Sequence, residues 1–137
     1  MSTIAEIEDE IRDEFAMFDD WEDRYNYLID LGKDLPLIDP ALKTDDRLIK
    51  GCQSRVWLHA QTQDGNVTYT ADSDAIITKG LIALMVRVLS GQKPEDIVHA
   101  ELSFIDDIHL REHLSPTRSN GLVSMINQMK RYAAQLA

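Results

Sequence analysis

The chain has 137 residues, a length that fits one globular domain with a single hydrophobic core. Its 14 basic and 24 acidic residues give a net charge of -10, the wrong sign for binding nucleic acid or an anionic membrane surface. No apolar stretch is long enough to span a bilayer, and the acidic start lacks the features of a secretory signal, so we expect a cytoplasmic protein. Residues 1–46 carry a net charge of -11, which is typical of a solvated helical surface.

The first 32 residues predict two short amphipathic helices. Thr3 and Glu6 have the spacing of a capping box, and apolar residues then recur every three or four positions. Asp19 or Asp20 can cap the second helix, and Gly32 offers a left-handed residue that would end it. The proline-containing stretch that follows is expected to be an ordered connector, because proline interrupts helices.

A β-hairpin is predicted next. Apolar and polar residues alternate over 55–63, and Asp64-Gly65 supplies the turn before a second strand over 66–71. The sequence "DSD" that ends at Asp74 offers helix-capping oxygens, and residues 75–89 are apolar on almost every side. We therefore expect a central buried helix after the hairpin.

The rest of the chain predicts more helix, over residues 94–100, 105–114 and 119–136. The pattern is that of an α+β protein with helices in the majority, in which the helices at both ends share a core with one small sheet. We expect residues 1–137 to form a single domain.

Cys52 is the only cysteine, so it can close no disulfide within the chain, and a reducing compartment would keep it a free thiol. The preceding Gly51 frees the backbone for a tight loop. The following Gln53 and Ser54 are too polar for the middle of a core strand. These neighbours predict that the thiol is presented on a loop.

Two interpretations of this thiol remain open. Lys50 and Arg55 are basic neighbours that would lower the pKa of Cys52 and make it reactive if they also lie close in space. Alternatively, Cys52 is a small buried apolar side chain, the commonest state of a free cysteine.

Other candidate chemistry is weaker. His109 and His113 have a helical spacing but lack a third metal ligand, so we expect no metal site. A Cys–His catalytic pair would need an oriented histidine, and no local signature selects one of the four. Arg118 precedes the last helix, where it is either a surface charge or a cation directed at a thiolate or a partner's carboxylate.

Three stretches together resemble the SufE family: "GCQSRVW" at 51–57, "DSDAIITKGLIAL" at 72–84 and "LSPTRSNGL" at 114–122. The resemblance extends through residues 20–36 and covers nearly the whole chain. It implies an α+β fold in which several helices flank a small three-stranded antiparallel sheet, shared with the IscU-type cluster scaffolds. Those scaffolds need three cysteines, whereas this chain has one.

The resemblance implies a sulfur acceptor of iron–sulfur cluster assembly. Cys52 would receive sulfur as a persulfide from a SufS-like, pyridoxal-phosphate-dependent cysteine desulfurase, stimulate its turnover, and pass the sulfur to a SufBCD-like scaffold complex. Such a carrier is not an enzyme by itself, needs no cofactor of its own, and is expected to form a homodimer. A lone thiol fits this role, because no resolving cysteine would discharge the persulfide.

The resemblance also implies roles for the other candidate residues. Arg118 matches an arginine near the acceptor loop and the desulfurase interface, and Asp74 matches a position that influences the loop. Gly51, Gln53 and Ser54 would shape the loop or contact the partner. We further expect the resting loop to hold Cys52 against apolar residues of the hairpin and the central helix, and docking to swing it out.

Three alternatives remain. The first is a stand-alone thiol enzyme, such as a thiol peroxidase or a sulfurtransferase. The second is a CsdE-like carrier that serves another desulfurase, although "CQS" after Gly51 favours SufE. The third is a docking adaptor that does not need its cysteine.

Overall fold

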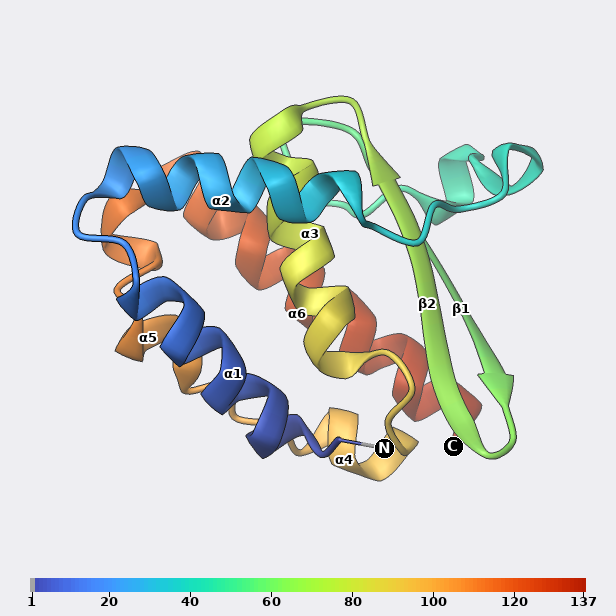
Figure 1. The fold of residues 1–137 in the computed structure, drawn as a ribbon. Helices are drawn as coiled ribbons and strands as arrows, with labels where there is room; N and C mark the ends of the chain where they lie inside the picture. Colours follow the sequence, from blue (N-terminus) through green and yellow to red (C-terminus); the bar gives the residue numbers. More distant parts are fainter. Residues whose placement is uncertain (1) are drawn as a thin grey trace.

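The structure is a computed structural model that describes residues 2–137. The chain forms the helices and strands α1 (Ile4–Ala16), α2 (Trp21–Lys33), β1 (Val56–Gln63), β2 (Asn66–Ser73), α3 (Ile76–Leu89), α4 (Pro94–Val98), α5 (Phe104–Asp107) and α6 (Pro116–Leu136). The α-helices gather on one side of the long hairpin, with α3 and α6 packed next to it, α2 running across α3, and α1 farther away (Figure 1). The expected α+β fold is confirmed.

Over residues 2–137 the sheet has two strands, so the expected three-stranded sheet is wrong. β1 and β2 pair in antiparallel register from Val56 opposite Ser73 to Gln63 opposite Asn66. The segment between α2 and β1 contributes only isolated bridges, a parallel one between Leu37 and Ala71 and an antiparallel one between Leu48 and Trp57. A 3-10 turn over 45–47 precedes the bridge at Leu48 and a second turn begins at residue 50, which leaves too little extended chain for a third strand.

Two glycines allow α2 and α3 to pack closely. A Cβ at Gly80 would lie 2.3 Å from the Leu28 carbonyl oxygen, and one at Gly32 would lie 3.1 Å from the Gly80 nitrogen. Gly32 therefore does not end its helix as expected, since α2 continues to Lys33. The residue is glycine because a second backbone approaches it, and this contact requires no left-handed conformation.

The ends of the helices follow local signals in most places. The capping box of Thr3 and Glu6 is present, and Asp20 rather than Asp19 caps α2. The helix expected over 105–114 is broken at His109, whose φ of 59° is left-handed, into α5 and a 3-10 turn. The last helix begins at Pro116, three residues earlier than expected, because Ser115 caps it.

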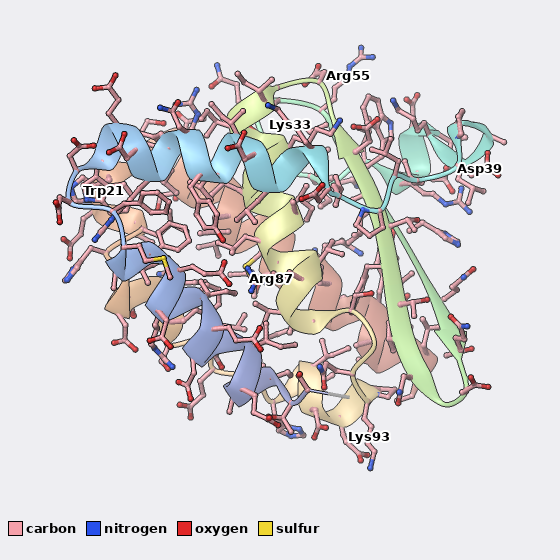
Figure 2. All side chains as sticks on the ribbon, in the orientation of Figure 1. Trp21, Lys33, Asp39, Arg55, Arg87 and Lys93 are labelled. Atoms are coloured by element: carbon pink, nitrogen blue, oxygen red, sulfur yellow. The ribbon has the colours of Figure 1, made fainter. Side chains whose placement is uncertain are left out.

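Hydrogen bonds fix α6 and α1 against the rest of the molecule. The Tyr69 hydroxyl on β2 donates to the Met129 carbonyl oxygen on α6 at 2.7 Å, and burial raises the pKa of Tyr69. Arg87 projects from α3 toward α1, where its guanidinium donates to the Glu14 carboxylate at 2.7 Å (Figure 2). The position of α6 is thereby set by the hairpin.

We expect Gly80→Ala to lower the free energy of unfolding by about 2 kcal/mol, because the new methyl group would collide with the α2 backbone at Leu28. Chemical denaturation measures this loss. Ile76→Ala is the matched control on the same helix, since Ile76 is 66% exposed and its truncation should change little. A Gly80→Ala protein as stable as the wild type would contradict the close packing of α2 and α3.

Candidate functional site: a thiol loop over a cavity

The loop of residues 50–55 carries Cys52 and leads directly into β1, as the sequence predicted. Two backbone hydrogen-bond donors at the ends of the loop, one on each side, fix it to neighbouring segments. The Ile49 N–H donates to the Val56 carbonyl oxygen at 2.8 Å, and the Arg55 N–H donates to the Asp74 carboxylate at 3.0 Å. The loop is therefore anchored at its base, beside the segment that joins β2 to α3.

Asp74 does not cap the central helix, so that expectation is wrong. The N-cap position of α3 is Ala75, and it makes no side-chain capping bond. The Asp74 carboxylate turns instead to the backbone of Arg55, and the Asp74 N–H donates to the Arg55 carbonyl oxygen at 3.3 Å. Arg55 lies beside this segment in Figure 2. The role left to Asp74 is to hold the base of the Cys52 loop.

The tip of the loop rests on α6. The Cys52 Sγ lies 3.6 Å from the Gly121 carbonyl oxygen, to which the thiol donates. Gly51 adopts a left-handed φ of 93°, and a Cβ there would lie 2.4 Å from the Ser124 hydroxyl oxygen. Glycine is therefore required at position 51 for two reasons. The backbone is left-handed, and Ser124 occupies the space that a Cβ would need.

A cavity of about 360 Å³ opens beside the thiol. It lies between the loop, α3 and the first turns of α6, and none of the described residues that line it comes from the hairpin. Thus the expected apolar cover is provided by α3 and α6 rather than by β1 and β2. The lining residues are Cys52, Gln53, Ser54, Thr78, Leu81, Ser115, Thr117, Arg118, Gly121 and Met125.

Cys52 is half-buried, and burial raises the pKa of its thiol. The alternative of a pKa lowered by Lys50 and Arg55 fails in this conformation, because both side chains are exposed to solvent. The alternative of a fully buried apolar cysteine fails too. The site holds a protonated thiol that is only partly sheltered.

The structure brings together four of the six expected site residues. Cys52, Gln53, Ser54 and Arg118 line the same cavity, with Arg118 in the first turn of α6. Gly51 does not line the cavity, but its left-handed backbone conformation sets the path of the loop. The expected site is thus one continuous surface, except for Asp74 at the loop base.

Six lining residues were not predicted from the sequence, namely Thr78, Leu81, Ser115, Thr117, Gly121 and Met125, and neither was Ser124 behind Gly51. Gly121 had a usable signal, because an isolated glycine inside a helical pattern often has a packing reason. Thr78 and Ser124 had none, since a hydroxyl residue on a helix is ordinarily a surface residue.

Other chemistry finds no support at this site. None of the described residues that line the cavity is a histidine. His113 stacks on Trp21 with ring centroids 3.9 Å apart, and His59 lies beside Arg47. Within residues 2–137 no three His, Cys, Asp or Glu side chains converge as metal ligands, and no helix in that range is long and apolar enough to cross a membrane.

Comparison with known proteins decides the family. The model of the SufE family, described as an Fe-S metabolism associated domain, matches residues 9–133. The chain belongs to the SufE family. The sequence resemblance is therefore confirmed, and the family's description places the chain in iron–sulfur metabolism.

Relatives agree with this assignment. An uncharacterized SufE-like protein of Rhizobium meliloti is 42% identical over 127 residues, which cover 89% of this chain and 91% of the relative. One of Rhizobium etli is 38% identical, covering 91% and 88%. The chloroplastic/mitochondrial SufE-like protein 1 of Arabidopsis thaliana is 40% identical over 82% of this chain but only 31% of its own length.

The fold also matches a solved structure. The solution structure of a hypothetical protein from Thermus thermophilus superposes with a TM-score of 0.79 at 20% sequence identity and covers 95% of each chain. At this identity the match supports the fold alone.

We expect Cys52 in the free protein to react with iodoacetamide more slowly than a cysteine in an unstructured peptide, because only the thiolate reacts and burial raises the pKa of the thiol. The rate should increase with pH, and its midpoint should lie above that of the unfolded chain, because burial raises the pKa of the folded thiol. Mass spectrometry of the alkylated protein gives the rates, and urea-unfolded protein is the control. A midpoint at or below that of the unfolded chain would contradict the sheltered thiol.

Proposed function

We propose that this protein is a sulfur carrier, which accepts sulfane sulfur as a persulfide on Cys52 from a cysteine desulfurase and delivers it to an iron–sulfur scaffold. The observation that carries the proposal is a lone, half-buried thiol on a loop, beside a cavity with room for more than the thiol. Membership of the SufE family supports it.

The transfer is a thiol–disulfide exchange onto a persulfide. The Cys52 thiolate attacks the terminal sulfur of the desulfurase cysteine persulfide, and a new S–S bond forms. The old S–S bond breaks, and its electron pair leaves on the desulfurase cysteine as a thiolate. The proton on the terminal sulfur moves with that sulfur. No external oxidant or reductant is consumed.

The closed loop limits this reaction to a docked partner. In the resting state burial keeps the thiol protonated, and a protonated thiol is a poor nucleophile. Between its anchored base and its contact with α6 the loop has few packed side chains, and Gly51 can change its backbone angles cheaply. Docking would move Cys52 into water or onto the partner, where its pKa falls.

The same features disfavour the alternatives. A stand-alone thiol peroxidase or sulfurtransferase activates its own cysteine, whereas the described lining of this cavity includes no histidine and the sequence has no second thiol. We therefore infer a carrier that stimulates a desulfurase and catalyses nothing alone. A CsdE-like carrier would share this chemistry and differ in the desulfurase that loads it.

Cys52→Ser tests the carrier directly. The serine preserves the shape of the loop, but its oxygen cannot carry the persulfide, so we expect complete loss of sulfur acceptance with an unchanged fold. After incubation with desulfurase and cysteine, intact-mass spectrometry should show a gain of about 32 Da on the wild type only. A serine variant that stimulates the desulfurase as well as the wild type does would instead favour a docking adaptor.

Asp74→Ala tests the closed loop. Removing the carboxylate that accepts the Arg55 N–H should loosen the loop base and increase both the alkylation rate of Cys52 and the stimulation of the desulfurase, each about fivefold or more. Asp74→Asn is the matched control, because its side-chain oxygen can still accept this bond. Equal alkylation rates in the wild type and the alanine variant would rule out a role for Asp74 in closing the loop.

A further inference from the structure

The outer edge of β1, on the side away from β2, is only half covered. The bridge between Leu48 and Trp57 covers the beginning of this edge. The residues before Leu48 form the 3-10 turn Asp45–Arg47 and leave the line of the strand. Within residues 2–137 no strand or bridge covers the outer edge over residues 60–63.

Four backbone groups on this free edge have no partner. Ala60 and Thr62 lie opposite Tyr69 and Val67 on β2, whose N–H groups both donate away from β1. Ala60 and Thr62 therefore occupy non-hydrogen-bonded positions of the antiparallel ladder, and their N–H and C=O groups point outward. None of these groups bonds to a described residue. Charged side chains usually protect such an edge, yet residues 56–63 include no Asp, Glu, Lys or Arg.

A groove of about 380 Å³ lies along this edge, beside the last turns of α6 (Figure 1). We call it the β1–α6 groove. Ala60 and His59 line it from β1, Tyr132 and Leu136 from α6, and Arg47 from the 3-10 turn. The groove therefore combines an unpaired strand edge with side chains from two other segments.

Three side-chain donors in the β1–α6 groove are unused. Arg47 is held in place by two bonds, from its Nε to the His59 Nδ1 at 3.4 Å and from its Nη1 to the Thr44 hydroxyl at 3.1 Å. Its Nη2 has no partner among the described residues. Because the His59 Nδ1 accepts, the ring proton lies on Nε2, which is also free. The Tyr132 hydroxyl is the third donor without a partner in residues 2–137.

The acidic residue in the described lining, Asp46, does not neutralise these donors. Its carboxylate accepts from the Thr44 hydroxyl and lies 3.7 Å from the Nη1 of Arg47, on the side away from the free Nη2. The Asp46 side chain is 77% exposed, so solvent screens its charge. The free donors therefore favour a ligand with an anionic acceptor.

Strand direction decides which anionic group can reach these donors. A strand that pairs antiparallel with the free edge continues the line of Leu48 and Ile49 and runs toward Arg47. Its carboxyl end therefore meets the donors. A parallel strand would bring its positively charged amino end to the same place.

We propose that the β1–α6 groove binds the extended C-terminal segment of a partner polypeptide, which adds a strand to β1 and places its terminal carboxylate on Arg47. Pairing at Ala60 and Thr62 uses all four free backbone groups. The Tyr132 ring and Leu136 contact an apolar side chain of the segment. The inference goes beyond sulfur transfer, since the groove lies about 20 Å along α6 from Arg118 at the Cys52 cavity.

The test uses a fluorescein-labelled peptide, Gly-Ser-Thr-Val-Thr-Val, with either a free terminal carboxylate or a terminal amide. We expect fluorescence anisotropy to show saturable binding of the acid and at least about tenfold weaker binding of the amide, which lacks the charge-assisted bonds. Acetate carries the charge without the backbone and should not displace the acid peptide at about a hundredfold excess. Equal affinity for the two peptides, binding of neither, or displacement by acetate overturns the proposal.

Arg47→Gln tests the carboxylate site. We expect this variant to bind the acid peptide about tenfold more weakly and the amide unchanged, because only the acid uses the charge. Tyr132→Phe removes a neutral donor and should weaken binding of the acid by only about threefold. Unchanged affinity for the acid peptide in Arg47→Gln overturns the assignment of the carboxylate site.

Thr62→Pro tests the strand edge, because it removes an outward N–H that β2 does not use. We expect about tenfold weaker binding, whereas Thr62→Val keeps the N–H and should bind like the wild type. Equal affinity in the proline variant overturns strand addition. Self-association in sedimentation velocity that Thr62→Pro abolishes would assign the edge to a second copy and overturn the peptide ligand. Cys52→Ser should bind both peptides like the wild type, so a failure of sulfur transfer leaves this test standing.

Discussion

The close approach of the Cys52 loop to α6 is the contact on which the site depends. It exists because Gly51 has no Cβ to meet Ser124 and can adopt a left-handed conformation. It also requires α6 to be in place, which the Tyr69 bond from β2 to α6 ensures. The hairpin therefore positions both the loop that leads into β1 and the helix on which that loop rests.

This arrangement separates a rigid frame from a movable tip. The frame is the buried α3, held closely against α2 through Gly80 and flanked by α6. The tip makes one hydrogen bond from Cys52 and one tight contact at Gly51, so opening it costs far less than disturbing the core. A carrier needs this combination, because it must present one atom to two partners in turn without unfolding.

Local signals made much of this fold predictable. The helices, the hairpin turn at Asp64-Gly65 and the loop position of Cys52 follow from periodicity and turn residues that lie close together in sequence. The missing third strand, the packing role of Gly32 and the true partner of Asp74 depend on segments distant in sequence. The periodicity of apolar residues carries no information on contacts between segments that are distant in sequence. The cavity between the loop, α3 and α6 was not predictable for the same reason.

The charges around the thiol act differently in the two states of the loop. In the closed state Lys50 and Arg55 point into water, where solvent screens them, and burial dominates the pKa of Cys52. In an open state burial no longer opposes ionisation, so the basic residues of the loop and Arg118 would stabilise the thiolate. The same sequence thus gives an unreactive, protonated thiol in the closed state and a reactive thiolate on docking. The conformation of the loop decides between the two states.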